Sequence, residues 1–149
     1  IEADVERISF TSRRNTMSRI LVKLRGQNAP IPLSSMGDGM RRILALAMLA
    51  AVAEDDFMFV DEIDTGLYYE TQIDMWRLLI ETAQRLNVQI FATTHSLDCV
   101  RAFQEALSQT EDQSAGKLLR LSLRSGEIQP VSYTTDDLTI AMRQEIEVR

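Results

Sequence analysis

Two adjacent carboxylates behind a short apolar run are the residues of this sequence with the clearest chemistry. Phe57–Val60 is apolar throughout, and Asp61 and Glu62 follow it at once. Such a run is typical of a central strand in a parallel sheet, and open α/β folds bind ligands at the carboxyl ends of these strands. Asp61 is suited to hold Mg²⁺, and Glu62 to orient or deprotonate a water beside a nucleotide γ-phosphate. The alternative is a strand that ends in a solvated acidic turn.

The only histidine of the chain follows a second apolar run. His95 comes 33 residues after Glu62, behind Val88–Ala92 and two threonines. If the two runs are neighbouring strands, the imidazole lies near the acids and can donate to a phosphate oxygen or position a water. A capping or core histidine is the alternative. A metal site of His95 and Cys99 is the weaker idea, because no further ligand lies nearby in the sequence.

A third candidate element is the loop Ser34-Ser35-Met36-Gly37-Asp38-Gly39, which precedes a long apolar stretch. Glycines let backbone amides approach an anion, and the N-terminus of a following helix adds a favourable dipole and free N–H groups. The loop can therefore bind phosphate. A plain helix cap is the alternative.

Periodicity predicts the elements that position these residues. Apolar residues at helical spacing predict a helix from Met40, covered on nearly all sides, and an amphipathic helix from Ile73 to Leu86 closed by Asn87. Strand, helix and strand in this order predict a right-handed parallel crossover. The other expected elements are a hairpin of Val5–Phe10 and Ser18–Leu24, an irregular Gln27–Pro32, a helix capped by Ser96 to about Leu107, a hairpin of Leu118–Leu123 and Ile128–Tyr133, and a helix from Asp136 or Asp137 toward Val148.

Composition indicates one globular domain of 149 residues with 45% hydrophobic residues and a net charge of −6. The longest nearly charge-free run, Ile43–Ala53, is too short to span a bilayer, so no membrane is expected as a partner. A single cysteine excludes an internal disulfide and favours the cytoplasm. The N-terminus has neither an initiator Met nor a signal pattern, so we expect a piece of a longer chain.

The charge is divided unevenly along the sequence. Residues 1–42 hold eight basic and four acidic side chains, whereas residues 43–149 hold eight and eighteen. The acidic part argues against an extensive nucleic-acid surface. In the basic part, DNA binding and a merely solvated hairpin are equally good interpretations of Arg13, Arg14, Arg19, Lys23 and Arg25.

Taken together and in this order, these elements resemble the C-terminal half of an ABC-type ATPase. The Leu33–Arg42 loop and helix look like the signature motif, FMFVDE like Walker B, Asp64–Leu67 like the D-loop, and TTHS like the switch-histidine loop. The segments GDGMRRILALA, VDEIDTGLYY and IFATTHS are most similar to those of bacterial AAA-type ATPases related to the OLD family, and more distantly to those of RecF and SMC heads. The resemblance runs from about Leu33 to Phe103.

The resemblance implies an α/β fold, the C-terminal lobe of a P-loop NTPase-like (ABC ATPase) head, with parallel strands, crossover helices and a final antiparallel hairpin and helix. Within this single domain, residues 1–32 would form the strand entry, 33–108 the motifs, and 109–149 the hairpin and last helix. No Walker A pattern GxxxxGK[ST] occurs, so the phosphate cradle is expected upstream, in the missing N-terminal lobe of the same chain.

The resemblance also implies ATP and Mg²⁺ as cofactors and a homodimer that pairs head to tail through the signature loop and D-loop. Asp61 would hold Mg²⁺, Glu62 would activate water and His95 would sense the γ-phosphate. The residues that would touch ATP, partly in the other subunit's site, are Ser34, Ser35, Gly37, Asp38, Gly39, Asp64, Thr65 and Gly66.

Two positions depart from the family pattern, and two other functions compete with it. Gly37-Asp38-Gly39 stands on the family's Ser-Gly-Gly, so the signature serine is either replaced by Gly37 or supplied from Ser34 or Ser35. Tyr68 stands where transporters usually have Asp. One alternative is a metal-dependent, Toprim-like nuclease using Asp61, Glu62 and Asp64, although the spacing of these acids differs from that fold. The other is a non-catalytic interaction module, whose contact surface would contain Tyr68, Tyr69 and Trp76.

Overall fold

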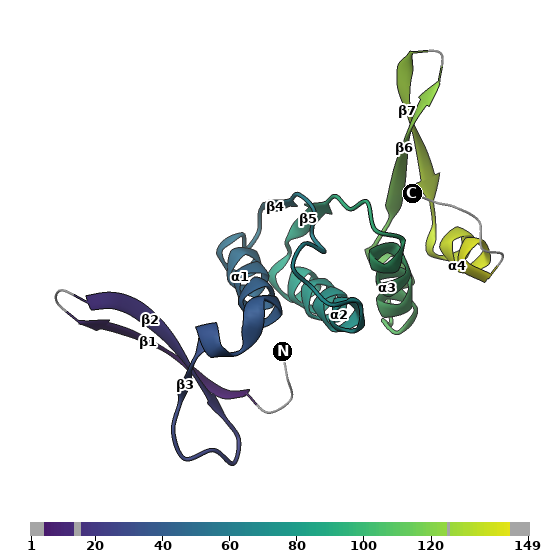
Figure 1. Ribbon diagram of the computed structural model, residues 1–149. Coiled ribbons are helices and arrows are strands. Elements are labelled where there is room, and N and C mark those ends of the chain that lie inside the picture. Colours follow the sequence, from purple (N-terminus) through teal and green to yellow (C-terminus); the bar gives the residue numbers. More distant parts are fainter. Residues whose placement is uncertain (1–4, 14–15, 125, 144–149) are drawn as a thin grey trace.

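A parallel pair of short strands forms the centre of the chain. In this computed structural model, which describes residues 5–13, 16–124 and 126–143, β4 (Phe57–Val60) pairs with β5 (Gln89–Ala92). The register runs from Phe57 opposite Gln89 to Val60 opposite Ala92. The helix α2 (Tyr69–Leu86) connects the two strands (Figure 1). This arrangement confirms the α/β class and the strand, helix, strand order.

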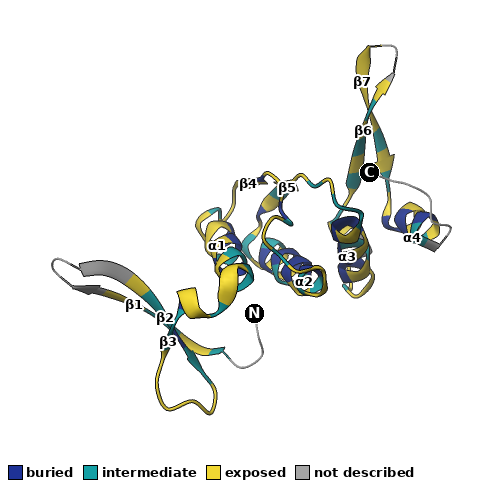
Figure 2. Cartoon of the chain, in the orientation of Figure 1, coloured by how far each residue is buried: buried dark blue, intermediate teal, exposed yellow. Residues whose placement is uncertain are grey.

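Three helices pack beside this pair and build the main core. α1 (Gly37–Val52) and α3 (Leu97–Ser108) flank α2, and the side chains between them are buried (Figure 2). α2 ends where Asn87 adopts a left-handed conformation with φ of 52°, and Ser96 caps α3 by accepting the Cys99 N–H, as predicted. The most deeply buried members of this core are Leu46, Ala50, Ile63, Met75, Leu79, Cys99, Ala106 and Leu107.

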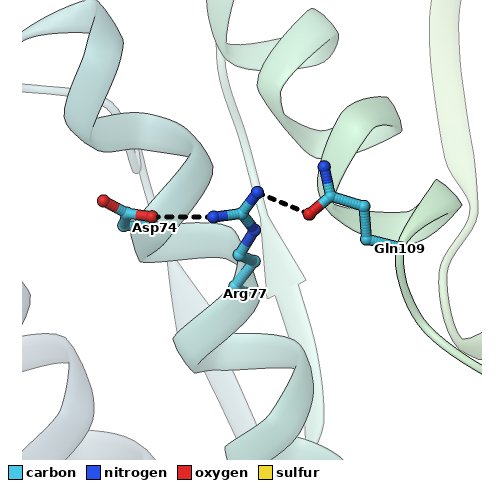
Figure 3. A network of polar contacts seen from close by, with 3 residues as sticks. All are labelled: Asp74, Arg77 and Gln109. Atoms are coloured by element: carbon cyan, nitrogen blue, oxygen red, sulfur yellow. Dashed lines mark hydrogen bonds and ion pairs between the residues drawn. The ribbon is translucent and has the colours of Figure 1, made fainter.

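Polar contacts hold α2 against α3 and the segment that follows it. The buried Trp76 Nε1 donates to the Cys99 carbonyl at 3.2 Å, and the Trp76 ring contacts Phe103. At the surface, Arg77 pairs with Asp74 at 3.1 Å and also donates to Gln109 (Figure 3). Trp76 is therefore a core residue, so the contact surface expected of an interaction module does not include it.

An antiparallel sheet precedes α1 and projects away from the helices (Figure 1). β1 (Val5–Arg13) pairs with β2 (Thr16–Leu24), and β2 pairs with β3 (Ile31–Pro32). The expectation that Gln27–Pro32 is irregular is wrong for its last two residues, because they extend this sheet by one short strand. A 3₁₀ turn at Leu33–Ser35 then leads into α1.

A second hairpin and a helix form the other end of the described chain (Figure 1). After a 3₁₀ turn at Gln113–Ala115, β6 (Leu118–Arg124) pairs with β7 (Glu127–Tyr133), as predicted. α4 (Thr135–Arg143) begins one residue before the predicted Asp136 and packs on α3 through the buried Leu138. The end predicted for this helix, near Val148, lies outside the described residues.

Burial differs from the expectation at α1 and β4. The predicted all-round cover of α1 is wrong, because Leu49 and Val52 are exposed, Val52 by 86%. β4 is not a central strand among the described residues, since it pairs with β5 alone and Phe57 and Phe59 face outward. Residues of only one face of the pair reach the main core. Both faces of β4 are apolar, and the described helices cover only one of them.

None of the helices that the structure describes combines the length and apolar character needed to cross a membrane.

Candidate functional site

The paired strands bring their carboxyl ends together, as the sequence predicted. Asp61 and Glu62 continue directly from β4 and are exposed. Thr93, Thr94 and His95 continue from β5, whose last residue lies opposite Val60. Residues separated by about 30 positions therefore share one edge of the sheet.

Glu62 has an unusual backbone conformation at this edge. Its φ is +45°, in the left-handed region that non-glycine residues rarely occupy. The conformation turns the chain out of the strand and into a tight turn, in which the Thr65 N–H donates to the Glu62 carbonyl at 3.0 Å. The Thr65 hydroxyl also donates to the Glu62 carboxylate at 3.2 Å. Such strain often marks functional sites, where surrounding contacts sustain it.

Two threonines that follow β5 bind the acidic turn. Thr93 Oγ1 accepts the Glu62 N–H at 2.9 Å and donates to the Asp61 carboxylate. Thr94 Oγ1 donates to Asp64 Oδ1 at 2.5 Å. Backbone bonds reinforce the link, because the Ile63 N–H donates to the Thr93 carbonyl at 3.0 Å. The second strand thus fixes the position of three acids that follow the first.

His95 lies next to this network with its side chain exposed to solvent. It stands between Thr94, which contacts the acidic turn, and Ser96, which caps α3. The strand pairing brings the histidine to the same edge as Asp61 and Glu62. An exposed imidazole in this place can meet a bound anion, and the predicted alternative of a core histidine is wrong.

The serine and glycine loop occupies the N-terminal end of α1. Ser34 and Ser35 lie in the 3₁₀ turn and are exposed, and Gly37 has a φ of +86°, which suits glycine. α1 begins at Gly37, three residues before the predicted Met40. Asp38 forms an ion pair with Arg41 across the first turn of the helix. The free N–H groups of this turn can bind an anion.

This loop lies against the segment that follows the acids. A Cβ atom built on Gly39 would stand 3.8 Å from the Gly66 carbonyl and from the Leu67 side chain. Asp64, Thr65 and Gly66 form the turn at that point, with the Leu67 N–H donating to the Asp64 carbonyl at 3.0 Å. The signature-like loop and the D-loop-like turn are therefore neighbours within one chain.

The carboxylate at this edge of the sheet suits a cation that also binds phosphate oxygens. Asp61 is an exposed carboxylate at the end of β4, and Mg²⁺ in nucleotide sites usually binds one or two carboxylates together with water and phosphate oxygens. Among the described residues, no group of three or more His, Cys, Asp or Glu side chains is placed to hold a metal ion. The nuclease alternative needs Asp61, Glu62 and Asp64 to converge, and the structure gives it no support.

The basic hairpin offers fewer free charges than its sequence suggests. Lys23 forms an ion pair with Glu6 across β1 and β2 at 3.1 Å. Arg19 and Arg25 are exposed. Arg14 and the side chain of Arg13 lie outside the described residues.

Comparison with known proteins assigns this arrangement to a family. The AAA ATPase domain profile matches residues 2–100, which include the loop, both strands, the acidic turn and His95. The chain belongs to the AAA ATPase domain family. One solved structure similar to the chain comes from work on ATP-driven dimerization and DNA stimulated activation of SMC ATPases, with a TM-score of 0.57 at 18% identity over 91% of this chain and 76% of that one. This likeness supports the P-loop NTPase-like fold.

Curated relatives of this AAA ATPase domain are mostly longer proteins. An ATP/GTP phosphatase of Helicobacter pylori is 23% identical over 95% of this chain, which spans 38% of its length. An uncharacterized protein of Methanocaldococcus jannaschii is 26% identical over 62% of this chain and 78% of its own. An ABC transporter A family member 7 of Dictyostelium discoideum is 31% identical over 64% of this chain, which spans 11% of the transporter.

Three residues of the AAA ATPase domain site were not singled out from the sequence. Thr93 and Thr94 carry a usable signal, since polar residues at the end of one parallel strand face those at the end of its neighbour. No sequence signal marks Arg42, because its Nη2 reaches the Glu62 carbonyl at 3.3 Å only through the packing of α1 beside the turn.

Proposed function

We propose that this AAA ATPase domain binds ATP and hydrolyses it with Mg²⁺ as part of a longer protein. The observation that carries the proposal is the shared edge of β4 and β5, where Thr93 holds Asp61 and Glu62 side by side next to His95. In this proposal Asp61 binds the cation, Glu62 accepts a proton from the attacking water, and His95 donates to the γ-phosphate. Bound Mg²⁺ would neutralise charge that develops on the phosphates.

The proposal includes a head-to-tail homodimer. Ser34, Ser35, Gly37, Asp38 and Gly39 would contact ATP bound by the partner subunit, together with the neighbouring turn of Asp64, Thr65 and Gly66. Ser34, Ser35, Gly37 and Asp38 are exposed around the N-terminus of α1, and Gly39 lies close to the Gly66 carbonyl, which supports this role. The SMC ATPases of the structural neighbour undergo ATP-driven dimerization. Tyr68, which stands where transporters usually have Asp, is exposed at the place where this contact would form.

The remaining phosphate cradle is proposed to come from an upstream lobe that docks on β5. Among the described residues, the outer edge of β5 has no strand partner, and an apolar cavity of 550 Å³ lies between it and β6, lined among others by Ile90, Phe91, Phe103, Leu118 and Leu119. Parallel sheets occur almost only with both faces covered. A strand and helix of the same polypeptide would fill this cavity and place a Walker A loop beside the acids.

Within the family, we propose kinship with the OLD-related ATPases. The sequence of three segments, GDGMRRILALA, VDEIDTGLYY and IFATTHS, supports this proposal. These segments form the N-terminal part of α1, the acidic turn and the histidine strand of the site.

The decisive test is Glu62→Gln in the protein that carries these residues together with its upstream segment. We expect ATP binding, measured by calorimetry, to stay within about threefold, and phosphate release to fall by a factor of about 10² to 10⁴, because only the proton acceptor is lost. Glu81→Gln is the matched control, since Glu81 is an exposed acid on α2. Hydrolysis by Glu62→Gln at the unchanged rate would exclude the assigned role.

A second test addresses the upstream lobe. Residues 1–149 alone should bind MgATP weakly, because their sequence has no Walker A pattern. Adding the upstream segment should raise the affinity by orders of magnitude in calorimetry. Micromolar binding by residues 1–149 alone would contradict this part of the proposal.

DNA is a further proposed partner, and it depends on the exposed Arg19 and Arg25. The SMC ATPases of the structural neighbour show DNA stimulated activation. If the hairpin binds phosphates, replacing both arginines by Gln should weaken DNA binding and reduce its salt dependence. Salt-dependent binding that survives both substitutions would remove Arg19 and Arg25 from this role.

A further inference from the structure

The Glu62 peptide is held from three different elements. Its N–H donates to Thr93 Oγ1 at 2.9 Å, from the end of β5. Its carbonyl accepts the Thr65 N–H at 3.0 Å, from the turn that follows. The same carbonyl accepts a hydrogen bond from Arg42 Nη2 at 3.3 Å, from α1. A residue with φ of +45° needs such contacts, because the unsupported chain would relax out of this conformation.

Arg42 is held in this place at a cost to the free energy of folding. The side chain is half-buried, and its Nε is buried without a hydrogen-bond partner among the described residues. An exposed position on α1 would leave all five N–H groups of the guanidinium to water. The neighbouring Arg41 instead pairs with Asp38 in the first turn of α1. Of these two adjacent arginines, Arg42 is the one that reaches the acidic turn.

We propose that Arg42 is a positioning residue for Glu62. Its hydrogen bond fixes the orientation of the Glu62 peptide, and the backbone conformation at Glu62 determines the direction in which its carboxylate extends. The inference rests on the proposed function of Glu62 as the group that accepts a proton from water. In this proposal Arg42 acts through the main chain, by its hydrogen bond to the Glu62 carbonyl, and not by touching the reacting atoms.

Misplacement of a catalytic group by about 1 Å can lower a rate by about 100-fold without weakening substrate binding. Arg42→Gln removes the fixed guanidinium, and Arg42→Lys keeps the charge without the planar fork that reaches the carbonyl. In the protein with its upstream segment, we expect both variants to lower kcat by about 10- to 100-fold while KM for ATP changes by less than about twofold. Arg85→Gln is the matched control, because Arg85 is an exposed arginine on α2.

A double-mutant cycle separates positioning through Glu62 from a general structural effect. If Arg42 acts through Glu62, Arg42→Gln causes no further loss of turnover in the Glu62→Gln background. Additive losses would overturn the inference, as would an unchanged kcat in the single variant. If Glu62→Gln itself retains full turnover, the proposed function of Glu62 fails first, which distinguishes the two failures.

Amide hydrogen exchange tests the same contact without nucleotide. Loss of the Arg42 hydrogen bond should loosen the turn, so the Thr65 amide should exchange at least about tenfold faster in Arg42→Lys and Arg42→Gln. The Leu79 amide, within the buried part of α2, serves as a check that both variants are folded. Unchanged exchange at Thr65 in folded variants would overturn the positioning role, whatever the outcome of the activity measurements.

Discussion

The hydroxyl of Thr93, at the end of β5, donates a hydrogen bond to the carboxylate of Asp61, at the end of β4. The same oxygen accepts the Glu62 N–H at 2.9 Å. One side chain of the second strand therefore orients two consecutive acids of the first. The sheet register and the placement of the acids depend on each other at this point.

Removing the Thr93 hydroxyl should impair the site more than the fold. Thr93→Val keeps the shape of the side chain but leaves the Glu62 N–H without its acceptor and Asp61 without its donor. Outer partners of this kind typically contribute about 10- to 100-fold to metal affinity or activity, so ATP turnover with the upstream segment present should fall by that factor. Thr93→Ser retains the hydroxyl and should stay within a few fold, and equal losses in both variants would contradict this reasoning.

A side chain at Gly116 should destabilise the fold, because the glycine is closely packed. A Cβ atom there would lie 2.7 Å from Phe103 Cζ and 2.9 Å from Leu107 Cδ2. Gly116→Ala forces the buried Leu107 and its neighbours to move, and overpacking of this kind costs about 1–3 kcal/mol. Urea unfolding of the chain should show this loss in the free energy of unfolding. Ala115→Ser adds one atom at the exposed neighbouring position and should leave the midpoint unchanged.

Cys99 should react slowly with thiol reagents in the folded chain. Its side chain has no exposed surface, and burial raises the pKa of the thiol, although hydrogen bonds with Trp76 and Thr94 oppose the shift. At pH 8 less thiolate is present than for a free cysteine, and the reagent has no access. Iodoacetamide labelling followed by mass spectrometry should be at least about tenfold slower than in urea. Equal rates in both conditions would contradict the buried position.

The start of α4 should weaken in acid through Asp137. The Thr134 N–H and hydroxyl donate to Asp137 Oδ2 at 2.9 and 2.7 Å, and they lower the pKa of this carboxyl. Because the folded pKa lies below the unfolded one, the stabilisation is complete above pH of about 4 and is lost as pH falls through the folded pKa.

Asp137→Asn should remove this pH dependence. Exchange of the Leu138 amide, which bonds to the Thr134 carbonyl at 2.9 Å, reports on the helix start. Its protection, corrected for intrinsic exchange, should fall as the pH is lowered from about 4 through the folded pKa of Asp137 in the unchanged chain, and vary less in the variant. Asp136→Asn, at the exposed neighbouring acid, should keep the dependence. The same pH profile in all three chains would rule out Asp137 as its source.

Patterns local to the sequence predicted most of the elements that build the site. The apolar runs before Asp61 and Thr93 located β4 and β5, and Ser96 and Asn87 marked helix ends. These signals work because strand burial, N-caps and left-handed helix ends each require particular residues at fixed positions.

Features that depend on tertiary packing could not be predicted from the sequence. The Arg42 contact with Glu62 joins residues 20 apart through the angle at which α1 packs. Apolar runs show which residues can be buried, but tertiary packing decides that Phe57, Phe59 and Val52 stay exposed among the described residues. The roles expected of Glu62 and His95 likewise stay predictions until turnover is measured.

The bare side of the β4 and β5 pair also affects how the protein must be produced and handled. Phe59 and Phe91 stack there with ring centres 5.2 Å apart, and both are exposed. An uncovered strand edge beside exposed aromatic rings is a template for pairing with other chains, which leads to aggregation. At high concentration residues 1–149 alone should therefore self-associate through this side, and the upstream lobe proposed above should reduce that association.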